Sequence, residues 1–286
     1  MMIKTEPIQI GNLKFDLLTC GNSTAGQPVM LLHGFPETHH MWIPLMEELS
    51  QQGYYCVAPN QRGYSNGAQP KGKKNYEIQF LTEDIFQISK LLGWKKFHLI
   101  GHDWGAVIGW QFAFIHPDVL FSWTALSVPH TRAFTEAIAT DPIQQKMSAY
   151  IRRFQWRWLP EYQLRKNNYA LLKKLWKHAP PQLVKDYLQV FSHTGTLSAT
   201  LSYYRANYAF LNKAEHPVLP DTISVPTLFV WGENDFAIGR YGVENCGKYV
   251  SAPYTFISLN TGHWLLQTAY LEVASAIIKH LKINNN

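Results

Sequence analysis

The chain has 286 residues, of which 46% are hydrophobic and 16% charged, and this composition excludes a disordered chain. Its three cysteines are far apart in the sequence and form no CxxC motif, which excludes a zinc ribbon and a thioredoxin-type redox site. The net charge of +6 is concentrated in residues 131–218, which carry 13 Lys and Arg against 5 Asp and Glu. No nucleic-acid-binding motif accompanies this charge, so we expect no nucleic-acid partner.

Strand and helix patterns alternate over the first 130 residues. Residues 8–20 predict a β-hairpin around Gly11-Asn12. Short apolar runs, each typical of a strand buried on both faces of a parallel sheet, follow at residues 29–32, 54–58, 97–100 and 123–128. Helices are predicted between them at residues 82–92 and 106–115, the second of which ends before His116-Pro117.

The middle of the chain has a different pattern. Residues 131–218 are helical in pattern and contain no clear strand, whereas strand runs return at 227–231 and 255–259, before a helix near 271–281. This order predicts an α/β core made of residues 1–130 and 219–286, with a mostly parallel central sheet, helices on both faces and a helical cap inserted at 131–218. The basic face of this cap is either simply solvated or attracts anionic substrates.

The end of the run at 97–100 carries the strongest motif, Gly101-His102-Asp103-Trp104-Gly105. It follows the G-x-S-x-G pattern of a nucleophile elbow, a tight turn between a strand and a helix, with Asp103 where Ser usually stands. The glycines are needed because the turn is tight and thrusts the central side chain out above the strand ends. The alternative is an Asp103 that only caps the following helix.

Two later strand ends supply partners for Asp103. Asp235 follows the run at 227–231, and His263 follows the run at 255–259. Nucleophile, acid and histidine therefore occur in the order Asp103, Asp235, His263, which is the chain order of the α/β-hydrolase triad. No acid lies at the end of the run at 123–128, and this favours Asp235 as the acid of the triad.

The loop after the run at 29–32 reads His33-Gly34-Phe35-Pro36-Glu37. Such a loop can aim backbone N–H groups at an oxyanion, and the predicted donors are the N–H groups of Phe35 and Trp104. Phe35, Pro36 and Trp104 are also predicted to contact the substrate, and Phe35-Pro36 is a candidate cis peptide. His39-His40 has no third ligand in a metal-binding pattern, so we expect no metal.

The motifs HGFPE, GHDWGA, WGENDF and TGHW together resemble the α/β-hydrolases of the epoxide hydrolase-like group, which includes the haloalkane dehalogenases. The resemblance covers nearly the whole chain and implies a small apolar epoxide as substrate and no cofactor. It also implies two cap tyrosines that bind the leaving oxygen. Residues 201–207 match the motif that carries one, on Tyr204 with Tyr203 as the fallback, and residues 148–155 resemble the stretch that carries the other, on Tyr150. Asn60 replaces a usual Asp at a position that we interpret as structural.

An aspartate nucleophile suits displacement at a saturated carbon, which leaves an alkyl ester on the enzyme. In this interpretation His263 activates the water that hydrolyses the ester, and Asp235 orients His263. Two alternatives stay open. The same triad could release halide from a haloalkane with Trp104 binding the halide, although Phe35 stands where those enzymes usually have Asn. The chain could also be a non-catalytic ligand-binding protein.

Compartment and assembly are less well determined by the sequence. The N-terminus has no apolar signal-peptide core, and no apolar run reaches the ~18 residues of a membrane span, so we expect a cytoplasmic protein without a membrane span. The oligomeric state, monomer or homodimer, is left open.

Overall fold

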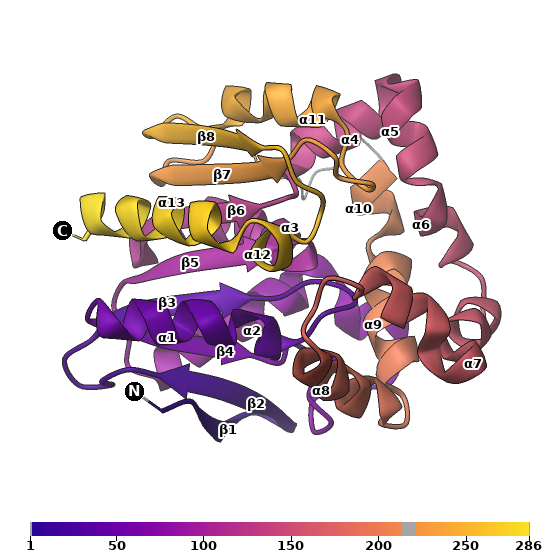
Figure 1. Cartoon of the computed structure of the whole chain (residues 1–286), viewed down its shortest axis with the longest axis horizontal. Helices are drawn as coiled ribbons and strands as arrows, with labels where there is room; N and C mark the ends of the chain where they lie inside the picture. The colour runs from indigo at the N-terminus through magenta and orange to yellow at the C-terminus, as the bar shows by residue number, and fades with distance from the viewer. Residues whose placement is uncertain (1, 213–220, 286) are drawn as a thin grey trace.

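A single eight-stranded sheet forms the centre of the molecule in the computed structural model, which describes residues 2–212 and 221–285 (Figure 1). The strand order is β1-β2-β4-β3-β5-β6-β7-β8; β2 pairs antiparallel with β1 and β4, and the remaining neighbours are parallel. The strands are β1 (Lys4–Ile10), β2 (Leu13–Cys20), β3 (Gln27–Leu32), β4 (Tyr54–Pro59), β5 (Phe97–His102), β6 (Leu120–Leu126), β7 (Thr227–Gly232) and β8 (Tyr254–Leu259).

Helices cover both faces of this sheet. Figure 1 shows α1 (Ile43–Gln51) and α13 (Tyr270–Ile283) in front of it, and α2 (Ile78–Leu91) and α3 (Trp104–Ile115) behind it. Strands β4 and β5 are buried along their whole length, as expected for apolar runs covered on both sides. Shorter helices complete the core: η1 (His39–Trp42), η2 (Lys73–Tyr76), η3 (Pro117–Val119), α11 (Arg240–Asn245), η4 (Cys246–Tyr249) and α12 (Leu265–Thr268). The predicted mostly parallel α/β fold is therefore confirmed.

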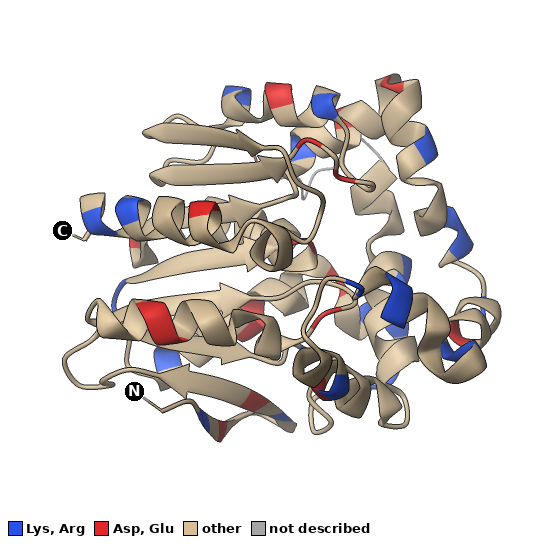
Figure 2. Cartoon of the chain, viewed as in Figure 1, with Lys and Arg blue, Asp and Glu red and all other residues tan. Residues whose placement is uncertain are grey.

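A run of helices lies between β6 and β7, above the carboxyl ends of the parallel strands. They are α4 (Thr131–Thr140), α5 (Pro142–Met147), α6 (Ala149–Arg153), α7 (Leu159–Leu175, with non-helical backbone at 166–169), α8 (Pro181–Ser192), α9 (Thr196–Ala206) and α10 (Tyr208–Asn212). The boundary predicted at residue 218 lies outside the described residues. Lys and Arg outnumber Asp and Glu on these helices (Figure 2).

Most strands begin or end a few residues away from the predicted runs, and two of these differences lie beside the elbow and the site. β5 continues to His102, immediately before the elbow, because Gly101 and His102 still pair with Ala125 and Leu126 of β6. β6 ends at Leu126 and not at residue 128, because Ser127 has a φ of 72°, a left-handed conformation that no strand accommodates. The predicted hairpin turn is present, and Gly11 adopts a φ of 55° in it.

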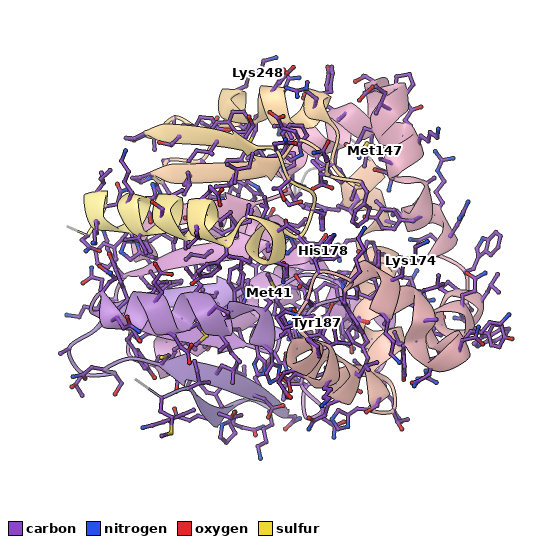
Figure 3. The ribbon with its side chains drawn as sticks, in the orientation of Figure 1. Met41, Met147, Lys174, His178, Tyr187 and Lys248 are labelled. Carbon is purple, nitrogen blue, oxygen red and sulfur yellow. The ribbon has the colours of Figure 1, made fainter. Side chains whose placement is uncertain are left out.

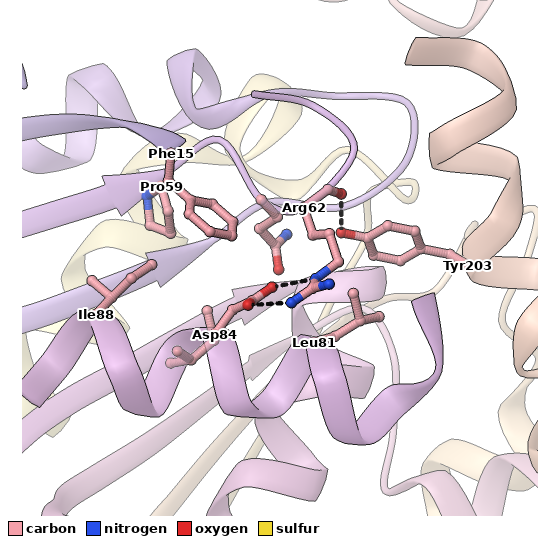
Figure 4. A pocket seen from close by; sticks show the side chains of 9 residues that line it. Phe15, Pro59, Arg62, Leu81, Asp84, Ile88 and Tyr203 are labelled. Carbon is pink, nitrogen blue, oxygen red and sulfur yellow. Dashed lines mark hydrogen bonds and ion pairs between the residues drawn. The ribbon is translucent and has the colours of Figure 1, made fainter. Parts of the chain in front are cut away.

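Several polar contacts fasten the cap helices to the core, and three of them are described here. Arg62 forms a buried bidentate ion pair with Asp84 of α2, at 2.7 and 2.6 Å, while its carbonyl oxygen accepts a hydrogen bond from Tyr203 of α9 (Figure 4). Tyr187 lies between α8 and the core and donates to Glu37 (Figure 3). The indole N–H of Trp176 donates to the carbonyl oxygen of Pro36. The cap is therefore held directly over the loop after β3.

No helix in residues 2–212 or 221–285 is long and apolar enough to cross a membrane.

Candidate active site

Asp103 occupies a sharp turn between β5 and α3. Its φ of 51° and ψ of −117° lie outside the regions that non-glycine residues normally adopt, so the turn is strained. Both glycines of the elbow motif are required: a Cβ at Gly101 would overlap the carbonyl oxygen of Gly105, and a Cβ at Gly105 would overlap the carbonyl group of Leu32. Gly34, in the loop after β3, is required as well, because a Cβ there would overlap the side chain of Asp103. Glycine is therefore required at these positions, and the predicted sharp turn at Asp103 is confirmed.

The ends of three parallel strands bring the predicted triad residues together. Asp103 follows β5, Asp235 follows β7 and His263 follows β8. His263 Nδ1 lies 2.8 Å from Asp235 Oδ2, and His263 Nε2 lies 3.6 Å from Asp103 Oδ2. The histidine is therefore hydrogen-bonded to Asp235 and stands next to the oxygen of Asp103 without a close hydrogen bond.

Asp235 is held by four hydrogen-bond donors. Its Oδ1 accepts from the backbone N–H groups of Ala237 and Ile238 at 2.8 and 3.1 Å. Its Oδ2 accepts from His263 and also from the hydroxyl of Ser127 at 2.8 Å. A buried carboxylate with this many donors stays ionised, and the balance lowers the pKa of Asp235 although burial acts to raise it.

The electrostatics of His263 depend on both carboxylates. Burial acts to lower its pKa, but the charge of Asp235, its hydrogen bond and the nearby carboxylate of Asp103 outweigh burial and raise the pKa to about 10. His263 is therefore an imidazolium at neutral pH as long as both carboxylates are charged.

The loop after β3 supplies one of the two predicted oxyanion donors. The N–H of Phe35 donates to Asp103 Oδ1 at 2.7 Å, and the Phe35-Pro36 peptide is cis, as the sequence suggested. Trp104 is the first residue of α3, and the N–H at such a position has no acceptor within its own helix. Asp103 Oδ1 is thus occupied by the amide of Phe35, whereas Oδ2 faces His263.

Asp103 lines two neighbouring apolar pockets, which we call lobes. The larger lobe has a volume of about 260 Å³, and the smaller one has about 20 Å³. Asp103, Tyr150 and Tyr204 line both lobes. The larger lobe is also lined by Phe35, Pro36, Phe154, Leu175, Phe236, Ala237, His263 and Trp264; the smaller one by Trp104, Val107, Val128, Phe134, Ile151, Leu211 and Ile238.

The two predicted cap tyrosines meet above Asp103. The ring centres of Tyr150 on α6 and Tyr204 on α9 are 5.9 Å apart, and Trp104 packs edge-on against Tyr204 at 5.1 Å. Burial, the neighbouring charge of Asp103 and, for Tyr204, the neighbouring Tyr150 raise the pKa of both phenols, so both keep their protons. The hydroxyl of Tyr203, the fallback for Tyr204, donates its hydrogen bond to the carbonyl oxygen of Arg62.

The comparisons with known proteins agree with this geometry. Residues 27–269 match the family model described as the alpha/beta hydrolase fold. Human epoxide hydrolase 4 is 34% identical over 91% of this chain and 73% of its own length.

The chain belongs to the alpha/beta hydrolase family, in its epoxide hydrolase-like group.

Two bacterial proteins extend this family relationship over nearly the whole chain. The AB hydrolase superfamily protein YfhM of Bacillus subtilis is 30% identical over 98% of both chains. The crystal structure of a Bacillus megaterium epoxide hydrolase in complex with an inhibitor superposes with a TM-score of 0.88 at 28% identity, over 97% of this chain and all of that one. The same Bacillus megaterium enzyme has been crystallised as a mutant with a naphthyloxy-propane-diol product.

Several residues of this epoxide hydrolase-like site were not predicted from the sequence. The apolar lining from Phe154, Leu175, Phe236 and Trp264 comes from four separate segments, and although Phe236 and Trp264 end the motifs WGENDF and TGHW, nothing in the sequence showed that they line the cavity. Ser127 was missed because no pattern marks a serine after a strand as a partner of a distant acid. Among the described residues, no Lys or Arg lines either lobe.

A second hollow, beside Arg62, is not a ligand site. Phe15, Pro59, Leu81 and Tyr203 are among the residues that surround it (Figure 4), and they leave no space for a water molecule. The Arg62–Asp84 ion pair occupies this region and connects the loop after β4 to α2. The ion pair therefore stabilises the part of the core that lies beneath the cap.

Proposed function

We propose that this protein opens epoxides to vicinal diols through a covalent ester on Asp103. The observation that carries the proposal is the placement of the carboxylate of Asp103 opposite two buried, protonated phenols, those of Tyr150 and Tyr204, in an apolar cavity. An epoxide between them meets a nucleophile on its carbon and hydrogen-bond donors on its oxygen. A nucleophile facing donors of this kind suits a leaving group that develops negative charge on oxygen.

In the first step, Asp103 Oδ2 attacks a ring carbon while Oδ1 keeps its hydrogen bond from Phe35. The carbon–oxygen bond of the epoxide breaks, and Tyr150 and Tyr204 stabilise the alkoxide that forms. The alkoxide takes a proton from one of these phenols, and the imidazolium of His263 returns a proton to the phenoxide. The product of this step is a hydroxyalkyl ester on Asp103 with a neutral His263.

In the second step, His263 Nε2 removes a proton from a water molecule, and the resulting hydroxide adds to the ester carbonyl carbon of Asp103. The N–H groups of Phe35 and Trp104 stabilise the oxyanion. The tetrahedral intermediate then breaks its bond to the oxygen of the substrate and releases the diol as an alkoxide. This alkoxide takes the proton from the newly formed carboxylic acid. Asp103 is again a carboxylate and His263 again an imidazolium, so atoms and charges balance over the cycle.

The charge of Asp103 couples the two steps. As a carboxylate, Asp103 helps to raise the pKa of His263 to about 10, and as an ester it no longer carries that charge. Ester formation therefore lowers the pKa of His263 at the point where a neutral imidazole is needed as the base. Asp235 keeps its charge throughout and stabilises the imidazolium that forms when water is deprotonated.

The unequal lobes support terminal epoxides as the substrate class. With the oxirane ring between Asp103 and the tyrosines, one substituent fits the lobe of about 260 Å³, whereas the lobe of about 20 Å³ has little space beyond the second ring carbon. The lining is aromatic and aliphatic, which favours an aryl or alkyl substituent without charge.

A paired assay tests the proposal. Purified protein is incubated with styrene oxide and an epoxidised fatty acid, read as diol, and separately with 1-bromobutane and 1,2-dibromoethane, read as halide. Diol without halide is expected. Halide without diol would establish the dehalogenase alternative, and binding without either product would establish a ligand-binding protein.

The His263→Gln variant tests the covalent step directly. It retains the nucleophile but lacks the base, so the intact mass of the protein should increase by the mass of one epoxide and the ester should persist. Asp103→Asn is the matched control, because it keeps the shape of the side chain and removes the nucleophile. The absence of an adduct in His263→Gln with every reactive epoxide would exclude the covalent mechanism.

A further inference from the structure

Ser127 lies at the end of β6 in a backbone conformation that serine rarely adopts. Its φ is 72°, its side chain is fully buried, and its N–H donates to the carbonyl oxygen of Val230 at 2.8 Å. The following residue, Val128, donates its N–H back to Leu126, which closes a tight turn around Ser127. Glycine or asparagine suits such a position better, so the backbone alone does not explain a serine here.

The side chain of Ser127 points at the acid and the base of the proposed triad. Its Oγ lies 2.8 Å from Asp235 Oδ2 and 2.9 Å from His263 Nδ1, and the latter two atoms are themselves 2.8 Å apart. These three atoms form a closed triangle. The hydroxyl has one proton, which it donates to the carboxylate, and its lone pairs face the N–H of the imidazole.

We propose that Ser127 is a positioning residue that holds Asp235 and His263 in the geometry required for hydrolysis of the ester. By donating to Oδ2, it restrains the carboxylate oxygen that His263 binds. The Ala237 and Ile238 amides restrain only the other oxygen, Oδ1. Without the hydroxyl, Oδ2 keeps His263 as its one donor, and the orientation of the imidazole relative to the ester carbonyl is less defined.

The kinetic consequence of this role rests on the proposed function and is confined to one half of the reaction. Ester formation uses Asp103 and the two cap tyrosines, and it does not require His263 as a base. Ester hydrolysis requires His263 to be hydrogen-bonded to Asp235 and oriented toward the ester carbonyl group. Loss of the Ser127 hydroxyl is therefore expected to slow ester hydrolysis by about 10-fold or more, which is the effect of losing a hydrogen bond to a buried charge, and to leave ester formation within about 2-fold.

Three variants separate the hydroxyl from the backbone. Ser127→Gly removes the hydroxyl and relieves the left-handed backbone, Ser127→Ala removes the hydroxyl and keeps the strain, and Ser127→Thr keeps the hydroxyl while its β-branched side chain increases the strain. The rates of ester formation and hydrolysis are measured in single-turnover reactions with styrene oxide, by intact mass after quenching. Hydrolysis should be slow in the Gly and Ala variants and near wild type in the Thr variant, whereas thermal stability should be highest in the Gly variant. Normal hydrolysis in the Gly variant would overturn the proposal.

A measurement without substrate separates this proposal from the proposed function. The proton on His263 Nδ1 is followed by NMR as a downfield resonance in the wild type and in Ser127→Gly. We expect the resonance to move and to exchange faster with water in the variant. An unchanged resonance would overturn the role of Ser127, whether or not the protein opens epoxides. A wild type that forms no ester, with a resonance that does change, would refute the proposed function and leave the positioning role standing.

Discussion

Replacing Asp235 by Asn removes one negative charge from the proposed site and keeps the size of the side chain. The pKa of His263 gives the size of the electrostatic effect that is lost. Raising the pKa of His263 from 6.5 to about 10, against burial, corresponds to about 5 kcal/mol of net stabilisation of the imidazolium. The charge of Asp235 is the largest of the contributions that raise it. In the ester state Asp103 is neutral, so in Asp235→Asn no carboxylate offsets the burial of His263.

We therefore expect Asp235→Asn to slow ester hydrolysis by about 10²–10⁴-fold while ester formation changes little. The assay mixes the variant with styrene oxide, quenches at intervals, and follows the fraction of esterified protein by intact mass beside the release of diol. The ester should accumulate in the variant and stay low in the wild type. Asp118→Asn, at an exposed position, is the matched control and should behave as the wild type.

The pH dependence gives the same test a second readout. With Asp235 neutral, burial lowers the pKa of His263 in the ester state, so its imidazole stays unprotonated to lower pH. The residual hydrolysis of Asp235→Asn should therefore persist at lower pH than that of the wild type. A variant with full hydrolysis and no accumulated ester would refute the assignment of Asp235 as the partner of the base.

The remaining predictions concern the leaving oxygen, the elbow and the scaffold. Tyr204→Phe should slow ester formation by about 10²-fold, because one donor to the developing alkoxide is lost, and should spare ester hydrolysis in single-turnover measurements; equal slowing of both steps would contradict this role. Gly34→Ala should abolish ester formation, read by intact mass, because the added Cβ overlaps Asp103. Asp84→Ala should lower the free energy of unfolding by about 3–5 kcal/mol, and the melting temperature by about 5–10 °C, because Arg62 is left buried without its partner. A double replacement, Arg62→Met with Asp84→Leu, should be less destabilised than Asp84→Ala alone, and calorimetry of both variants checks this.

Most of the fold was predictable because its signals are local. Buried parallel strands require continuous apolar runs, and the elbow at Asp103 requires small residues at fixed spacing, so both leave patterns within a few residues. The chain order of Asp103, Asp235 and His263 added a long-range prediction. It succeeded in placing the three together because parallel strands have their carboxyl ends at the same edge of the sheet.

The prediction of the β6 end was less accurate for a physical reason. The apolar run continues through Val128, so periodicity alone extends the strand, whereas the left-handed backbone of Ser127 ends it at Leu126. A serine in the sequence does not predict a left-handed backbone, because only tertiary contacts offset the energetic cost of that conformation. The contacts of Ser127 with Asp235 and His263 come from segments more than a hundred residues away along the chain.

The sequence by itself thus determined the class of fold, the family, and the residue types at the centre of the site, because these depend on local spacing and on the order of strands. Only the tertiary structure decided which of two adjacent tyrosines faces the cavity. Neighbouring helix positions point about 100° apart, and the packing of α9 against the core turns Tyr203 to Arg62 and Tyr204 to Asp103. It also decided the unequal lobes of the cavity, because their lining side chains come from segments that meet only in the folded chain.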